Sequence, residues 1–144
     1  MIIGIGICLR EPNYLLGVNA LAVDNCGNLF DACELAVMAA LKTTKLPVAT
    51  IVDEEVVLSE DETFDLPINN ELALCTFVKI GDKMIIDPTL SEEKVASARL
   101  NVGVTKDGHI CSMQKGGKHP LTKEDILFAV NMAVTKTKEL IEHL

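Results

Sequence analysis

The chain alternates between short apolar runs typical of strands and two segments in which apolar residues recur at the helical period. Seven runs are rich in β-branched and aliphatic residues and are bounded by glycine, proline or polar residues. They predict strands at residues 1–9, 16–23, 48–52, 72–78, 84–86, 100–104 and 110–114. The first run lacks a positive leader and a small-residue cleavage site, so it reads as a buried strand rather than a signal peptide. Because it begins abruptly, we expect the chain to start in the middle of a fold.

Two segments have the apolar periodicity of helices. The first is predicted over residues 30–42, after a polar turn in which Asn28 or Asp31 is expected to cap the free amides. The second extends to the end of the chain. It is preceded by Thr122, with Asp125 three residues later, which is the spacing of a capping box.

The turns between the predicted strands indicate how the elements follow one another. Gly81-Asp82 and Asp107-Gly108 each join two strand runs and favour hairpins, while the acid-rich stretch 53–62 is predicted to be a solvated loop. The resulting order of strand, helix, two hairpins and helix indicates the α+β class, with helices packed on an antiparallel or mixed sheet. We expect one domain over residues 1–144.

Composition and charge limit what the chain can bind by itself. Apolar residues make up 49% of the sequence, enough for a core, and no apolar run reaches the roughly 20 residues that cross a bilayer. The net charge is −8 and uneven, because residues 1–75 hold 3 basic and 12 acidic side chains. Affinity for a nucleic-acid backbone comes largely from cationic side chains, so this chain is not expected to bind RNA by itself.

The chain has five cysteines, an odd number, and none of them forms a C-x-x-C pair. Most lie within apolar stretches, which predicts reduced cysteines that act as small core residues and suits a reducing compartment. They are Cys8, Cys26, Cys33, Cys75 and Cys111.

Common cofactor and metal motifs do not fit. Gly4 and Gly6 are followed by Leu9, where a dinucleotide fingerprint needs a third glycine, and His109 with Cys111 lacks two further ligands for zinc. We therefore expect no metal and no cofactor. The stretch 115–119, Lys-Gly-Gly-Lys-His, is open to two interpretations: a solvated connector before the last helix, or a phosphate-binding loop.

Four segments, taken together and in order, carry a family resemblance. Residues 24–33 (DNCGNLFDAC) and 85–93 (IIDPTLSEE) are followed by 98–102 (ARLNV) and 107–117 (DGHICSMQKGG). They resemble the non-catalytic RNase PH-like subunits of the RNA exosome. The resemblance implies an RNase PH-like fold and covers only the C-terminal half of that domain, a βαβ-type half-domain.

The resemblance also implies a test of catalysis. In active relatives, the resemblance implies, RNA is degraded from its 3′ end by phosphorolysis, and two carboxylates six residues apart assist the departing oxygen together with a divalent metal. The first position falls on Glu93 and the second on Arg99. A guanidinium holds neither a metal nor a transferable proton at working pH, so the chain is expected to be catalytically silent. Asp87 is expected to serve turn geometry beside Pro88.

The remaining expectations follow from the same resemblance. The chain would join other RNase PH-like subunits in a six-membered ring, through whose channel RNA passes, and would support RNA processing and degradation, including rRNA processing. The resemblance implies a location in the nucleus, including the nucleolus, and in the cytoplasm. It implies no association with a membrane. Candidate contacts to RNA phosphate are Arg99, Lys115 and Lys118.

Two other readings remain open. One is an active phosphorolytic 3′–5′ exoribonuclease that uses Glu93 and an unrecognised acid, and the other is a free-standing interaction or RNA-binding module. A free-standing module predicts a closed, well-packed monomer, whereas a half-domain predicts exposed apolar surface beside the first strand.

Overall fold

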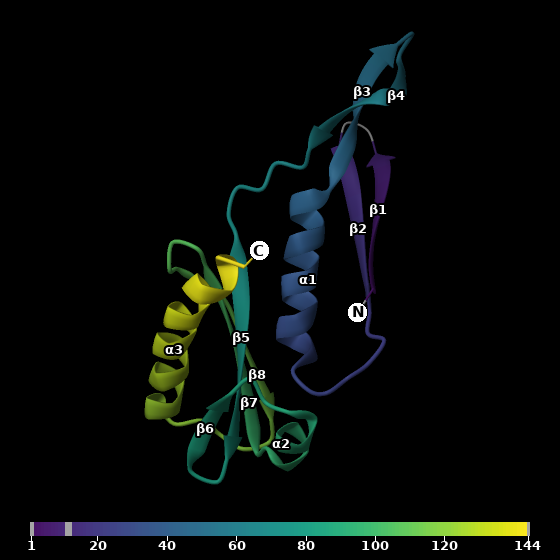
Figure 1. The fold of residues 1–144 in the computed structure, drawn as a ribbon. Coiled ribbons are helices and arrows are strands. Elements are labelled where there is room, and N and C mark those ends of the chain that lie inside the picture. Colours follow the sequence, from purple (N-terminus) through teal and green to yellow (C-terminus); the bar gives the residue numbers. More distant parts are fainter. Residues whose placement is uncertain (1, 11–12, 144) are drawn as a thin grey trace.

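The computed structural model describes residues 2–10 and 13–143, which form three antiparallel sheets and three helices (Figure 1). Two of the sheets are separate hairpins, and the third has four strands in the order β6-β5-β7-β8. The strands are β1 (Ile2–Arg10), β2 (Asn13–Leu21), β3 (Lys45–Val52), β4 (Glu55–Asp65), β5 (Leu72–Ile80), β6 (Lys83–Ile86), β7 (Ala98–Thr105) and β8 (Ile110–Gly117). The helices are α1 (Leu29–Thr43), α2 (Leu90–Val95) and α3 (Lys123–Ile141). The predicted α+β class with antiparallel pairing is confirmed.

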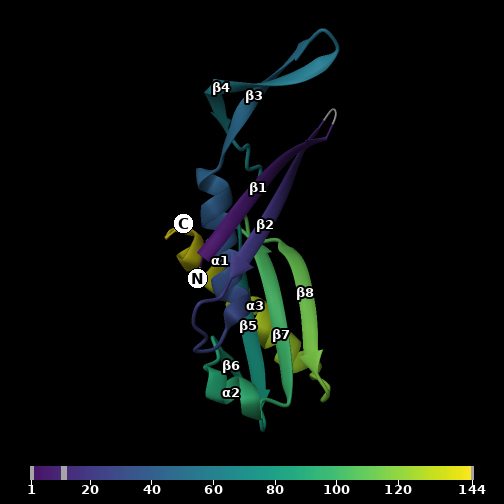
Figure 2. The same cartoon turned by 90° about the vertical axis from the view of Figure 1, so that its right-hand side faces the viewer.

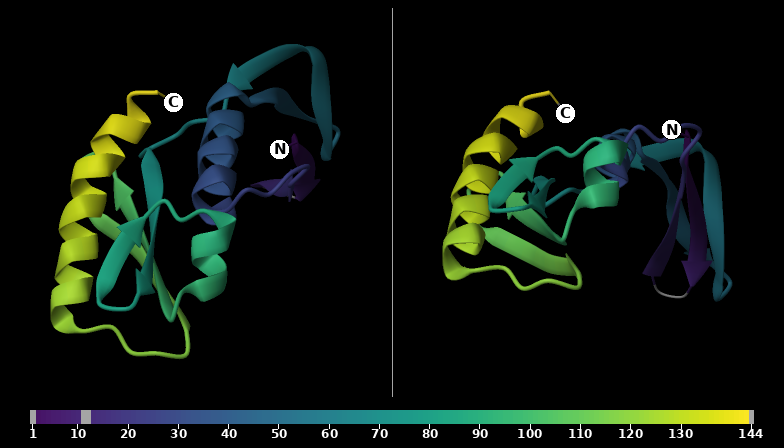
Figure 3. Two further views of the ribbon diagram at one scale, coloured as in Figure 1. Left: turned by 60° about the horizontal axis from the view of Figure 1, so that its bottom comes forward. Right: turned by 90° about the horizontal axis from the view of Figure 1, so that it is seen from below.

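The main core lies between α3 and one face of the four-stranded sheet (Figure 3). In the register of β5 and β7, Phe77 is opposite Leu100, and both are almost fully buried. Ala129 and Ala133 of α3 are fully buried against this layer, and their small side chains let the helix approach the sheet closely. The aromatic-poor, aliphatic composition therefore yields a core in which one phenylalanine is surrounded by valine, leucine and alanine.

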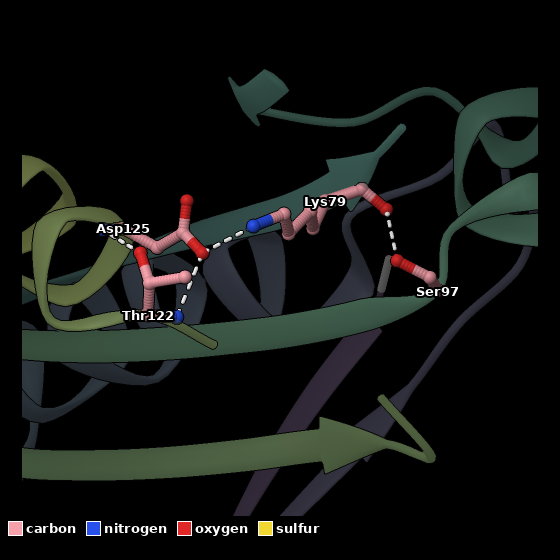
Figure 4. Close-up of polar contacts among 4 residues, drawn as sticks. All are labelled: Lys79, Ser97, Thr122 and Asp125. Atoms are coloured by element: carbon pink, nitrogen blue, oxygen red, sulfur yellow. Dashed lines mark hydrogen bonds and ion pairs between the residues drawn. The ribbon is translucent and has the colours of Figure 1, made fainter. Parts of the chain in front are cut away.

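The first turn of α3 is attached to the sheet by a polar cluster shown in Figure 4. Thr122 and Asp125 form the predicted capping box, and Asp125 also pairs with Lys79 at the end of β5. The carbonyl oxygen of Lys79 accepts a hydrogen bond of 3.1 Å from the hydroxyl of Ser97, which precedes β7. The local capping signal thus also fixes where the helix meets the sheet.

α1 lies along β5, which runs between α1 and α3 in Figure 1. β6 pairs only with the last residues of β5, so the backbone amides of Leu74 and Thr76 have no strand partner on that side. Two carboxylates of α1 take the place of a strand: Glu34 accepts from Leu74 N at 3.1 Å and Asp31 accepts from Thr76 N at 2.8 Å. Buried backbone amides need such partners, so α1 completes the edge of the sheet.

Two expectations about the chain between α1 and β7 are wrong. The acid-rich stretch 53–62 is not a loop: only Asp53 and Glu54, with φ of 51° and 67°, form the turn, and the rest belongs to β4. Pairing with Ala49–Val52 of β3 holds residues 55–58 extended, whereas residues 59–62 lie at an irregularity of the register and have no partner on β3. The short helix α2 was not expected, although Thr89 and Glu92 form a capping box that starts it.

The expectation that the cysteines are core residues holds only in part. Cys75 is buried in the main core, but Cys26 and Cys111 are exposed. Cys26 lies in the turn before α1 and Cys111 on the outer strand β8 (Figure 2), where neighbouring apolar residues do not imply burial. The side chain of Cys8 and the predicted burial of the run 1–9 lie outside the described residues.

β2 exposes apolar side chains. Four large ones on this strand and the turn after it are between 40% and 68% accessible: Leu15, Val18, Leu21 and Val23. Apolar surface is therefore open along β2 in this structure. No helix in the described part of the chain has the length and apolarity that crossing a membrane requires.

Candidate functional site

The two segments that carry most of the family resemblance, residues 24–33 and 85–93, meet in space at the start of α1. The amide of Leu90 donates a hydrogen bond of 2.8 Å to the carbonyl of Cys26. Gly27, with φ of 116°, lies so close to the loop before α2 that a Cβ there would be 2.5 Å from the carbonyl oxygen of Pro88. Only glycine combines this backbone conformation with this approach.

Asn28 stands at the N-cap position of α1 but does not cap the helix as expected. Its φ is 49°, and its side chain makes no capping hydrogen bond. The side-chain amide instead donates to Asp31 at 2.8 Å and to Asp87 at 2.7 Å. Asp87 has φ of 54°, which agrees with the turn role expected for it, and it also joins α1 to the β6–α2 loop.

A chain of hydrogen bonds continues from Asp31 into the sheet. The hydroxyl of Thr76 donates to Asp31 at 2.6 Å and accepts from the side-chain amide of Asn101 at 2.8 Å. Thr76 and Asn101 are buried opposite each other on β5 and β7. Burial raises the pKa of the Asp31 carboxyl, while hydrogen bonds from Thr76 and Asn28 oppose that rise. Sequence patterns did not single out Asp31, Thr76 and Asn101 as a network, because its hydrogen-bonded pairs are separated by 45 and 25 residues.

Glu34 gives the fold a pH dependence that can be measured. Burial raises the pKa of this carboxyl from its ordinary value of 4.5 to about 7, and the hydrogen bond from the amide of Leu74 only partly opposes this. A carboxyl with a raised folded-state pKa binds its proton more tightly when folded, so its contribution to stability falls as pH rises from about 4.5 to 7.

We therefore expect Glu34→Gln to remove this dependence, because glutamine keeps an acceptor for Leu74 N and does not ionise. At pH 8 the variant should be more stable than the unmodified chain by about 1 to 2 kcal/mol, a value reduced because water screens a half-exposed carboxyl. Urea unfolding at pH 5 and pH 8 measures this difference in stability. Glu142→Gln is the control for the loss of an exposed carboxylate. If the free energy of unfolding changed equally between pH 5 and pH 8 in the unmodified chain and in Glu34→Gln, Glu34 would not be the source of the pH dependence.

Glu93 and Arg99, on which the resemblance places the two carboxylate positions of active relatives, line one hollow of about 220 Å³. Glu93 accepts a hydrogen bond of 3.1 Å from the backbone amide of Asn28. The guanidinium carbon of Arg99 lies 4.3 Å from the centre of the Phe30 ring, a cation–π contact. Gly116 faces Arg99 in the register of β7 and β8 and leaves room for the guanidinium, since a Cβ would be 3.2 Å from Nη2.

This arrangement does not fit the divalent metal that active relatives are thought to use. One of the two positions is a cation, and the carboxylate of Glu93 is engaged with the start of α1. Within residues 2–10 and 13–143, no group of three or more His, Cys, Asp and Glu side chains is placed to hold a metal ion. The same hollow is better suited to an anion: Nε of Arg99 is buried and has no hydrogen-bond partner among the described residues.

The three candidate RNA contacts do not form one patch. Lys115 is opposite Leu100 on β7, one position from the Arg99–Gly116 pair, so Lys115 and Arg99 point to opposite faces of the sheet. Lys115 donates to the carbonyl of Gly117 at 2.7 Å, and Lys118 is exposed just beyond the end of β8. The stretch 115–119 is thus partly strand rather than a connector throughout.

Comparisons with known proteins agree on one family. Residues 70–136 match the family model described as the 3′ exoribonuclease family, domain 2. The chain is 45% identical over 140 residues to the exosome complex component Rrp42 of Methanothermobacter thermautotrophicus, which covers 96% of this chain and 52% of the relative. It is 34% identical over 136 residues to Rrp42 of Methanopyrus kandleri, which covers 93% and 51%. The chain therefore spans about half the length of these curated relatives.

Solved structures show the same likeness. The chain superimposes on the Archaeoglobus fulgidus exosome with RNA bound to the active site, with a TM-score of 0.78 and 28% identity over 90% of this chain and 48% of that one. An archaeal exosome core gives the same TM-score and identity, over 90% of this chain and 50% of that chain. The match to the 3′ exoribonuclease family thus lies in residues 70–136, and the chain has an RNase PH-like fold and is similar in sequence to about half of exosome component Rrp42.

Proposed function

We propose that the chain serves as a non-catalytic structural subunit of an RNA exosome ring and thereby supports 3′–5′ RNA processing and degradation. The observation that carries this proposal is the hollow shared by Glu93 and Arg99. Where active relatives need a pair of carboxylates, this chain has a guanidinium stacked on Phe30 and a carboxylate that binds the backbone of Asn28. Such a site can hold RNA phosphate but has no acid pair with which to assist a leaving oxygen.

Two features support assembly as the main role. The relatives it matches are named exosome components, and the apolar side chains along β2 present a surface of the kind that protein contacts cover. The partners would be other RNase PH-like subunits in a six-membered ring, with RNA passing through the central channel. The location in nucleus, nucleolus and cytoplasm stays a prediction of the family resemblance, as does a role in rRNA processing.

The two competing readings are less well supported. An active phosphorolytic exoribonuclease would need a second acid beside Glu93, and the residues that share its hollow are Val78, Ala96, Ala98, Arg99 and Gly117. A free-standing module would be a closed monomer, in contrast to the exposed apolar residues on β2.

A phosphorolysis assay tests the silent-subunit proposal. Single-stranded RNA labelled at its 3′ end is incubated with the purified chain and inorganic phosphate, and release of labelled nucleoside diphosphate is followed. We expect no release from the chain, either unmodified or as Arg99→Asp, because Glu93 remains bound to Asn28. Phosphate-dependent release that Glu93→Gln abolishes would show that the chain is an enzyme and would overturn the proposal.

Arg99 is expected to contribute to RNA binding in the assembled ring. Arg99→Ala should weaken binding of single-stranded RNA about tenfold, because it removes a charge-assisted contact to phosphate. It should also reduce the slope of log K against log salt by about 0.7, the contribution of one phosphate contact to a single strand. Fluorescence anisotropy at several salt concentrations measures both quantities.

A matched control separates this effect from general charge loss. Lys83→Ala removes one exposed positive charge from β6, which does not line the hollow, and should leave affinity and salt slope nearly unchanged. If Arg99→Ala and Lys83→Ala behave alike, Arg99 does not contact phosphate and serves only to pack on Phe30.

A further inference from the structure

The hairpin β3–β4 projects from the body of the molecule (Figures 1 and 2). Its base is fixed: the hydroxyl of Tyr14 donates to the carbonyl of Pro47 at 2.8 Å, and the rings of Tyr14 and Phe64 lie edge to face with their centroids 6.0 Å apart. The amide of Leu66 donates to the carbonyl of Thr44 at 3.0 Å and closes the two ends together. Beyond this base, the described residues of β3 and β4 pack almost entirely on each other.

Apolar side chains lie on both faces of the projecting part. In the cross-strand register, Ile51 pairs with Val56 and Ala49 with Leu58, which places these four side chains on one face. Val52 and Val57 lie on the opposite face. Ile51 is 79% exposed, Val52 51%, Val57 47% and Leu58 42%. An isolated two-stranded ribbon is at best marginally stable in water, so one with apolar side chains on both faces is suited to being covered.

The same hairpin carries most of the chain's negative charge. Residues 45–65 hold seven carboxylates and one lysine, a net charge of −6 out of −8 for the whole chain. The carboxylates lie at the turn and along β4, and those of β4 include Glu60, Asp61 and Glu62, all exposed. An apolar strip is therefore bordered by acidic side chains.

Charge restricts what can cover this hairpin. RNA and anionic lipid surfaces are negative and would be repelled, and a second copy of this chain would bring another −8. A protein surface with an apolar groove bordered by lysine and arginine matches both the apolar strip and the acidic border.

We propose that β3–β4 is a docking arm that inserts into a basic-rimmed apolar groove on another protein subunit of the assembly. This inference rests on the proposed function, which supplies the assembly, and adds to it the segment that makes the contact and the chemistry of its receptor. Side chains of Ile51, Val52, Val57 and Leu58 fill the groove, and the carboxylates around them pair with its rim. Electrostatic attraction would also speed and orient docking, and salt would weaken it.

The test uses the full chain and the purified exosome subunits encoded by the same genome, each titrated against fluorescently labelled chain. We expect one subunit to bind, with Ile51→Asp weakening the affinity at least about tenfold, the size of effect that a buried apolar anchor gives. Val95→Asp is the matched control, because Val95 is 66% exposed on α2 and α2 lies at the opposite end of the molecule from the hairpin (Figure 1). It should change the affinity less than twofold.

A second variant keeps the test independent of the apolar substitution. Glu60→Lys combined with Glu62→Lys reverses two exposed charges on β4 and should weaken binding at 50 mM NaCl far more than at 500 mM NaCl. Glu142→Lys reverses one exposed charge at the end of α3 and should not. Circular dichroism of each variant is compared with that of the unmodified chain before titration.

The possible results separate the two proposals. If no subunit binds the unmodified chain, the proposed function fails and the docking arm fails with it. If a subunit binds but Ile51→Asp and the double charge reversal have no effect, or Val95→Asp weakens binding as much, the docking arm alone is overturned. Self-association of the chain that Ile51→Asp abolishes would identify a second copy as the occupant and would equally overturn it.

Discussion

Gly27→Ala is expected to lower the free energy of unfolding by about 3 kcal/mol or more. At Gly27, φ is 116°, a conformation that an L side chain rarely adopts. A Cβ at this position would lie 2.4 Å from the amide nitrogen of Leu90 and 2.5 Å from the carbonyl oxygen of Pro88. Both atoms belong to the backbone, which cannot rotate away as a flexible side chain would. The contact between the turn before α1 and the loop before α2 would have to open.

Gly81→Ala is the matched control for this prediction. Gly81 also has a positive φ, 59°, but a Cβ there would meet nothing within 4 Å. Its substitution should cost about 1 kcal/mol, the usual price of placing alanine in the left-handed region. Urea denaturation followed by circular dichroism measures both variants. Equal losses of stability would mean that the close approach of Gly27 to the loop before α2 does not limit the fold.

Asp31→Ala should cost about 2 to 4 kcal/mol, because one carboxylate serves three donors. It accepts from the amide and the hydroxyl of Thr76 and from the side-chain amide of Asn28. Thr76 is fully buried, so its amide would be left without a partner and without water. Each buried donor left unpaired costs about 1 to 3 kcal/mol. Urea unfolding gives the total loss, and hydrogen exchange at the Thr76 amide shows whether this bond is its source.

Asp65→Ala provides the comparison. Asp65 is an exposed carboxylate at the base of the hairpin and pairs with Lys45 across the strands. Its loss should change stability by less than about 0.5 kcal/mol and leave exchange at Thr76 unaltered. If Asp31→Ala is as mild as Asp65→Ala, the network from Asn28 to Asn101 contributes little to the stability of the fold.

The features that sequence predicts best here are local ones. The last helix is predictable because Thr122 and Asp125 stand three residues apart before an apolar stripe, and the capping box that they form lies within one turn. The hairpin turns at Gly81 and Gly108 were predicted for the same reason, and both glycines have positive φ. The capping box of Thr89 and Glu92 is an equally local signal for the start of α2.

The features that sequence missed depend on partners far along the chain. The composition of the stretch 53–62 predicts a solvated loop, yet residues 55–58 pair with β3 and the strand β4 continues beyond them. Asn28 was expected to cap α1, but its side chain bonds to Asp87, 59 residues away, and its amide to Glu93, 65 residues away. Spacing along the sequence does not encode such contacts. The resemblance located Glu93 and Arg99, but only the fold shows that they share a hollow and that Lys115 faces the other way.

The carboxylates of α1 along β5 have a consequence for how the sheet can grow. On that side, Asp31 and Glu34 occupy the amides that an added strand would need, and β6 continues the edge for only four residues. On the other side, β8 pairs with β7 along one edge, and among the described residues no strand pairs with its other edge. A strand from another protein, whether a partner subunit or a misfolded chain, therefore finds one long free edge on this sheet, that of β8. A further strand can therefore be added to the four-stranded sheet at β8, but not at the edge that α1 covers.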